Sequence, residues 1–151
     1  MTFSELLEQA KTSKVRAYKD IPVVLNKQKV VLRVYEIPSY DWAGLTTKHP
    51  PRDDSASDKA LGYNLTAAGI DAAGMGAFVL DGEEETRVTA EQWDTLLEVL
   101  HGVELGNLAD AAFALNDWLP RNRVAAAKKA SAGDSKKSSS SPANSESPSE
   151  G

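Results

Sequence analysis

The segment from residue 88 to residue 129 restricts the fold of this chain most, because it has the pattern of two successive amphipathic helices. Thr89 and Gln92 have the spacing of a capping box, in which each side chain bonds the backbone nitrogen of the other residue. The apolar residues that follow are spaced i, i+3, i+4 and i+7, which places them on one helical face. They are Trp93, Leu96, Leu97 and Leu100. Gly102 is expected to end this helix in the left-handed conformation.

A second helix is predicted after Gly102, and its apolar face is broad. The residues on that face are Leu105, Leu108, Ala109, Ala112, Phe113, Leu115 and Trp118. Pro120 is predicted to halt or kink this helix, because proline has no backbone N–H to donate. Residues 123–130 are able to restart it and to give it a basic last turn.

The N-terminal third predicts a short helix followed by a β-hairpin. Residues 3–11 form the helix, capped by Thr2 or Ser4, with Leu6, Leu7 and Ala10 on one side. Apolar residues then alternate over 21–25 and 30–34 around a short polar turn, which is typical of two antiparallel strands. The opposite face of this hairpin holds Val24, Val31 and Tyr35, so we expect both faces to be covered.

The middle of the chain has weaker signals. A helix with Ser39 as its N-cap is predicted. It must end before His49, because a residue that precedes proline is pushed out of the helical region. Residues 52–59 read as a polar loop. The glycine-rich stretch 61–80 predicts a short helix near 65–74 and a strand near 77–80, and residues 81–87 a turn and linker.

These elements predict an α+β fold with an N-terminal β-hairpin, four or five helices and a disordered C-terminal tail. We expect one domain over residues 1–130, which contain all the tryptophan, tyrosine and phenylalanine residues. Residues 131–151 are rich in serine and lysine and lack large apolar side chains, so they cannot offset the entropy of ordering.

Charge is segregated along the chain, whose net charge is −5. Residues 71–117 contain eleven acidic residues against the single base Arg87. Residues 1–52 hold nine bases and five acids, and residues 118–137 hold six bases and one acid. An acidic body between basic ends suits self-association or a basic partner, and it also suits ordinary solvated surfaces.

The sequence favours a protein without catalytic, metal or cofactor chemistry. It has no cysteine, and its two histidines, His49 and His101, stand outside any metal-binding spacing. We expect His49 in a loop and His101 at a helix C-terminus, where the helix dipole stabilises a cation. We also expect no membrane span and no signal peptide, hence a soluble intracellular protein. The basic segment 121–137 has no interleaved aromatic residues, which makes nucleic-acid binding the weaker hypothesis.

The apolar helical faces are the stronger functional signal. They carry more large apolar side chains than a small domain easily covers, so we expect part of them to form a groove or an oligomer surface. The candidate partner-binding residues are Trp93, Leu97, Leu100, Leu108, Phe113 and Trp118. The alternative is that most of them pack against one another and against the hairpin.

The order of these motifs resembles the tail assembly chaperones of phages with long non-contractile tails, especially phages of actinobacteria. The resemblance covers residues 20–130. It is carried by IPS at 37–39, YDW at 40–42, LGYN at 61–64, VTAEQWDTLLEVL at 88–100, and the leucine and alanine spacing from Glu104 to Asn116. The long glycine-dotted segment 61–80 departs from this pattern.

The resemblance implies a non-enzymatic chaperone that binds the tape measure protein and keeps it soluble while the tail tube is built. It also implies a location in the host cell cytoplasm and absence from the mature virion. A programmed frameshift would give a longer product that contacts tail tube subunits. Two alternatives remain: a structural virion component, such as a minor tail or head–tail connector subunit, and a small regulatory or nucleic-acid-binding protein.

Overall fold

The computed structural model describes residues 1–139, and residues 140–151 lie outside this description. Most of the tail predicted to be disordered therefore lies outside the described residues, and residues 131–139 form the last part of a helix. The chain divides into two units, of which the first is Met1–Asn116 and the second begins at Asp117. Each unit is described by itself.

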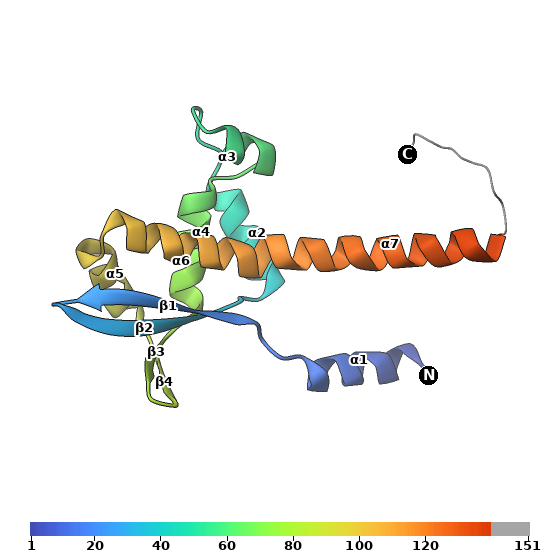
Figure 1. Cartoon of the computed structure of the whole chain (residues 1–151), viewed down its shortest axis with the longest axis horizontal. Coiled ribbons are helices and arrows are strands. Elements are labelled where there is room, and N and C mark those ends of the chain that lie inside the picture. Colours follow the sequence, from blue (N-terminus) through green and yellow to red (C-terminus); the bar gives the residue numbers. More distant parts are fainter. Residues whose placement is uncertain (140–151) are drawn as a thin grey trace. The chain divides into compact units, whose positions relative to one another are not determined.

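The fold of the first unit is α+β, as predicted, and is built on a four-stranded antiparallel sheet in the order β1-β2-β3-β4 (Figure 1). Strands β1 (Tyr18–Leu25) and β2 (Gln28–Tyr35) form the predicted hairpin. Both residues of its turn have positive φ, 50° at Asn26 and 66° at Lys27, as in a type I′ turn. This turn matches the twist of the strands without a glycine.

Of the turn and linker predicted at 81–87, the turn is confirmed and the linker is wrong, because these residues form the second hairpin of the sheet. Strand β3 (Ala77–Asp81) pairs with β2, and β4 (Glu84–Arg87) pairs with β3 across a turn in which Gly82 has a φ of 66°. All four residues of β4 are exposed. A short charged strand at a sheet edge resists pairing with other chains, and it has no apolar alternation by which the sequence could indicate it.

Helices α4 (Leu65–Gly76) and α6 (Gly102–Phe113) lie on one face of the sheet and enclose the core (Figure 1). The two helices approach closely because Gly69 has no side chain: a Cβ at this position would lie 2.7 Å from the carbonyl oxygen of Ala109. The largest fully buried apolar side chains are those of Leu32, Leu108, Leu115, Val23 and Val34. The predicted helix near 65–74 and strand near 77–80 are confirmed.

The opposite face of the sheet is not covered as predicted, because Tyr18 and Val24 are 47% and 56% exposed. The rings of Tyr18 and Tyr35 lie 5.5 Å apart, and the guanidinium of Arg33 lies 3.9 Å from the Tyr18 ring centroid. Apolar residues on this face thus make cross-strand aromatic and cation–π contacts at a solvated surface instead of a second core.

The described residues contain seven α-helices and one π-helical segment, against the four or five helices predicted. Besides α4 and α6 these are α1 (Phe3–Ser13), α2 (Ser39–Lys48), α3 (Ala56–Leu61), α5 (Ala90–Val99), the π-helical Ala114–Trp118 and α7 (Leu119–Ser139). Helix α3 lies where a loop was predicted. It forms because the Ser55 side chain caps it and the buried Asp58 carboxylate accepts hydrogen bonds from Arg52.

Two predicted helix boundaries are corrected. Gly102 begins α6 instead of ending α5, and the glycines with positive φ in the described chain are Gly62 and Gly82. His101 therefore lies at a helix N-terminus, not at the C-terminus expected from the sequence. Of the two effects predicted for Pro120, halting is wrong, because the π-helical segment ends at Trp118 and α7 begins at Leu119. A wider turn just before proline accommodates its missing N–H.

Candidate partner-binding surface

The structure does not bring the six predicted partner-binding residues together on one exposed face. Trp93, Leu100 and Leu108 are 7%, 7% and 0% exposed and belong to the core, which corrects the prediction that they contact a partner. Leu97 and Phe113 are partly buried and pack against the same core. Trp118, in the second unit, is 52% exposed. The apolar residues of α5 and α6 therefore serve mainly to form the hydrophobic core.

Trp93 is fixed in the core by its contact with α4. Its indole ring packs against Gly74, where an added Cβ would overlap the ring. Its Nε1–H is buried and has no hydrogen-bond partner among the described residues. Trp93 is therefore mainly a core residue, and its edge contributes to the wall of an open pocket between α4 and α5.

An open apolar groove lies beside α5, between this helix and the helix-covered face of the sheet. Its cavity volume is about 420 Å³, within the range of about 300–1,000 Å³ typical of ligand sites. From the sheet it is lined by Leu25, Val30, Leu32 and Val79, with Val88 after β4, and from α5 by Glu91, Gln92, Thr95, Leu96 and Val99. Val99, on the α5 wall, is 55% exposed.

The groove exists because the helical cover of the sheet thins toward the turn of the β1–β2 hairpin. Val23 and Leu32 are buried under α4 and α6, whereas Leu25, Val30 and Val79 are only partly buried. The side chains on the core face of each strand are apolar up to the end of the strand. Where no helix covers that end, these aliphatic side chains contact water.

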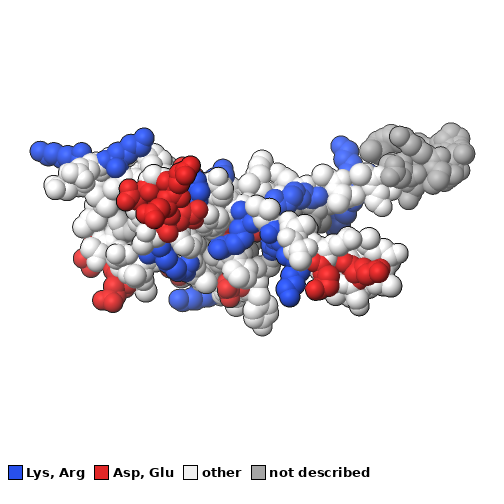
Figure 2. Space-filling view, turned by 90° about the horizontal axis from the view of Figure 1, so that it is seen from below, with Lys and Arg blue, Asp and Glu red and all other residues white. Residues whose placement is uncertain are grey.

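Acidic side chains lie on the elements that border this groove, and Glu91 is part of its lining. Helix α5 exposes Glu91, Asp94 and Glu98. The β3–β4 hairpin carries Asp81, Glu83, Glu84 and Glu85, and Figure 2 shows the acidic side chains gathered in a compact patch over this hairpin. An apolar groove with an acidic margin favours a partner segment that has apolar anchors and basic neighbours.

The first helix presents a second apolar surface. Helix α1 is closed at its start by a capping box, in which Thr2 N–H donates to Glu5 Oε2 at 2.6 Å and Glu5 N–H donates to Thr2 Oγ1 at 3.1 Å. The predicted helix and its cap are therefore confirmed. None of its residues is buried: Phe3 is 74% exposed, and Leu6 and Leu7 are each 52% exposed. An amphipathic helix normally buries such a stripe against another element.

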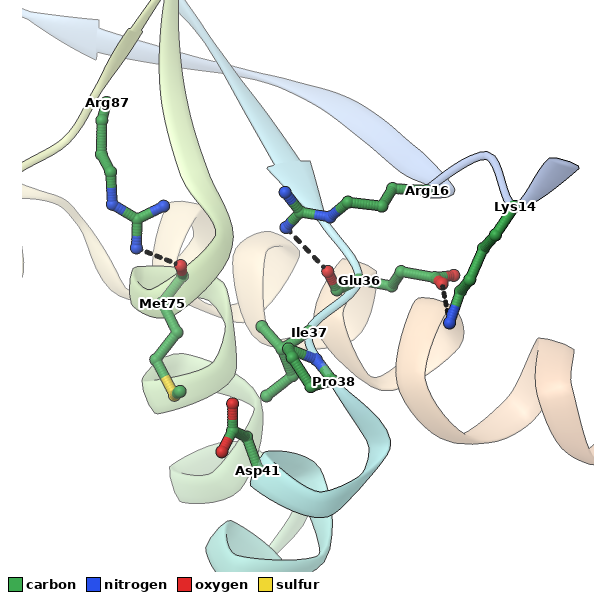
Figure 3. A pocket seen from close by; sticks show the side chains of 8 residues that line it. All are labelled: Lys14, Arg16, Glu36, Ile37, Pro38, Asp41, Met75 and Arg87. Atoms are coloured by element: carbon green, nitrogen blue, oxygen red, sulfur yellow. Dashed lines mark hydrogen bonds and ion pairs between the residues drawn. The ribbon is translucent and has the colours of Figure 1, made fainter. Parts of the chain in front are cut away.

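A pocket of about 540 Å³ at the other end of the hairpin is charged (Figure 3). Three cations line it, and each already has an acceptor. Lys14 Nζ lies 3.9 Å from Glu36 Oε1, Arg16 Nη2 donates to the Glu36 carbonyl oxygen at 3.0 Å, and Arg87 Nη2 donates to the Met75 carbonyl oxygen at 2.6 Å (Figure 3). The first two contacts attach the segment after α1 to the end of β2. We assign all three a structural role.

The other charged groups with low exposure also stabilise the fold. The Arg52 guanidinium, bonded to Asp58 at 2.7 and 3.0 Å, holds the pKa of that carboxyl well below its usual range. His49, at the C-terminus of α2, bonds Asp71 at 2.7 Å. Among residues 1–139, no group of three or more His, Cys, Asp or Glu side chains could hold a metal ion. The same residues contain no helix that is both long enough and apolar enough to cross a bilayer.

Sequence reasoning missed the groove because its walls come from three separate segments. Val99 lies beside the regularly spaced apolar residues of α5, and from the sequence it looks like an isolated surface valine. It was nevertheless the one signal on this helix that could have indicated the groove. Val79 belongs to a strand that was predicted without the strands that pair with it. Only the pairing of β3 with β2 places it next to Leu32 and Val30.

Comparison of the chain with known protein families, with curated proteins and with solved structures finds no match.

Proposed function

We propose that this protein is a non-enzymatic assembly chaperone of phage tail morphogenesis, which binds the tape measure protein and keeps it soluble while the tail tube is assembled. The observation that carries the proposal is the open apolar groove between α5 and the sheet. The folded domain leaves aliphatic side chains of a strand end and of a helix in contact with water. Such a surface is suited to cover apolar side chains of another polypeptide.

The energetics of the groove suit reversible holding. Burying one aliphatic side chain stabilises a complex by about 1.5–3 kcal/mol, while association costs about 4–15 kcal/mol. A groove that accepts a few such side chains therefore binds weakly as a single site. Many copies on one long helical client gain strength from multiplicity, and each copy still exchanges. The exposed acidic side chains of α5, Glu91, Asp94 and Glu98, help to keep the complex with the client soluble.

The motif order from residue 20 to residue 130 also supports the proposal, since it resembles that of tail assembly chaperones. On this proposal the protein acts in the host cell cytoplasm and leaves before the virion is complete. A longer frameshifted product, sharing the first unit, would connect the client to tail tube subunits.

The test is co-expression with an apolar fragment of a phage tape measure protein. We expect the wild-type protein to keep the fragment in the soluble fraction and Val99→Arg to reduce this strongly, because the substituted side chain places a charge in the groove wall. Val103→Arg is the matched control, since Val103 is 73% exposed in α6 and does not line the groove. Equal solubilisation by both variants would show that the groove is not the client site.

A structural virion component is the second candidate. The exposed stripe of α1 and the solvated aromatic face of the sheet would suit a subunit that stays packed against neighbours. Purified mature particles distinguish the two functions: a virion component is present there in stoichiometric amount, and a chaperone is not.

A further inference from the structure

We propose that α1 of one copy of this protein docks in the apolar groove beside α5 of a second copy. The chain thus carries both halves of a self-association interface, and each half lacks a partner within its own unit. The inference concerns the protein alone, so it does not depend on the identity of any client.

The two halves match in chemistry and length. Helix α1 offers Phe3, Leu6 and Leu7 on one face, and the groove offers aliphatic side chains of the sheet and α5. Helix α1 has 11 residues and α5 has 10, so both are about 15–16 Å long and could pack along their whole length. Lys11, in the last turn of α1, can pair with Glu91, the acidic residue in the groove lining.

Helix α1 does not reach the wall of Leu25 and Val30 in its own chain, because the segment behind it is attached at the opposite end of the hairpin. Glu36 N–H donates to the Ala17 carbonyl oxygen at 2.9 Å, and Lys14 and Arg16 contact the same Glu36 (Figure 3). Glu36 follows the last residue of β2, whereas Leu25 and Val30 of the groove flank the turn at the opposite end.

The distances exclude a fold-back onto this wall. From Ala17 to Leu25 the chain advances by the eight residues of β1, roughly 26 Å at about 3.3 Å each. Helix α1 reaches only about 16 Å from Ser13. With residues 14–17 held beside Glu36, the stripe of α1 stops about 10 Å short of the groove wall formed by Leu25 and Val30. A second copy has no such restriction, and this is why we assign the groove to its α1.

Sedimentation velocity on the full chain over a dilution series tests the proposal. We expect the wild-type protein to associate reversibly, and Leu6→Gln with Leu7→Gln to raise the dissociation constant by about tenfold or more, since the central apolar anchors of the interface are lost. Glutamine keeps the helix propensity. The matched control, Glu8→Gln with Thr12→Gln on the opposite face of α1, should associate like the wild type. Val99→Arg should weaken association as strongly, and Val103→Arg should not.

Mixing the two deficient proteins gives the decisive result. The double α1 variant keeps an intact groove and Val99→Arg keeps an intact α1, so the mixture should form a one-to-one heterodimer although neither protein associates alone. The proposal is overturned if the wild-type protein is monomeric at all concentrations, if the mixture yields no heterodimer, or if Trp118→Gln abolishes association while the α1 and groove variants do not. Circular dichroism of each variant confirms that it is folded.

Discussion

The carboxylate of Glu104 accepts a hydrogen bond from the backbone nitrogen of Val24 at 2.7 Å and thereby joins the start of α6 to strand β1. Its other oxygen accepts from the backbone nitrogen of His101 at 3.0 Å, which caps the helix. One side chain thus fixes both the beginning of α6 and the position of this helix on the sheet. It also holds in place the edge strand that ends at Leu25, in the groove wall.

This arrangement predicts an acid-sensitive contribution to stability. The hydrogen bonds from His101 and Val24 lower the pKa of Glu104. A carboxyl whose folded pKa is lowered stabilises the fold above its unfolded pKa, about 4.3, and loses this contribution as the pH falls through the folded value. Glu104→Gln should therefore lower the free energy of unfolding at neutral pH, and the difference from wild type should shrink below about pH 4.

Urea denaturation at several pH values measures this difference. Glu98→Gln, at an exposed position on α5, serves as the control and should follow the wild-type profile. A Glu104→Gln protein that is as stable as wild type at neutral pH would contradict the role assigned to the Val24 and His101 hydrogen bonds.

The close contact of α4 with α6 predicts opposite effects at two glycines. Gly69→Ala should destabilise the protein by about 1–3 kcal/mol, because the new methyl group meets the backbone of Ala109 and forces the helices apart. Gly106→Ala should stabilise it by about 0.5–1 kcal/mol, because nothing lies within 4 Å of the added Cβ and alanine favours the helix. Thermal and urea unfolding of both variants test the pair. Equal signs would contradict the packing of α4 on α6.

The division between core and surface leucines gives another prediction. Leu108→Ala should lower the free energy of unfolding by about 2–5 kcal/mol, because Leu108 is fully buried and the change leaves a cavity. Leu7→Ala should change it by no more than about 0.5 kcal/mol at concentrations where the protein is monomeric. Denaturant titration compares them. A large loss for Leu7→Ala would show that α1 packs on its own chain, against the exposure of its stripe.

Strong local patterns predicted much of the fold. The alternation over 21–25 and 30–34 predicted the β1–β2 hairpin, and the capping box at Thr89 predicted the start of α5, where Thr89 Oγ1 accepts from Gln92 at 3.1 Å. Elements without such patterns were missed. Strand β4 is wholly charged or polar and is a strand only because β3 pairs with it, and α3 depends on the ion pair of Asp58 with Arg52.

The candidate site was harder to predict than the fold, for a physical reason. Spacing on a helix shows which residues share a face, but it does not show whether the sheet covers that face. Trp93 and Leu108 have the same pattern as partner-binding anchors, and both are buried within the first unit. Leu25 and Val99 became candidates only when the uncovered end of the hairpin was seen to lie beside α5.

The most direct test of the account is to observe where an apolar helical segment of the client meets the folded protein. Methyl NMR of the Leu6→Gln, Leu7→Gln protein, in which the groove is free of α1, reports this during titration with a tape measure peptide. We expect shift changes concentrated at the methyl groups of Leu25, Val30, Val79 and Val99, with Val103 and Val124 unchanged. Binding that leaves these four groups unperturbed, or no binding at saturating peptide, would contradict it.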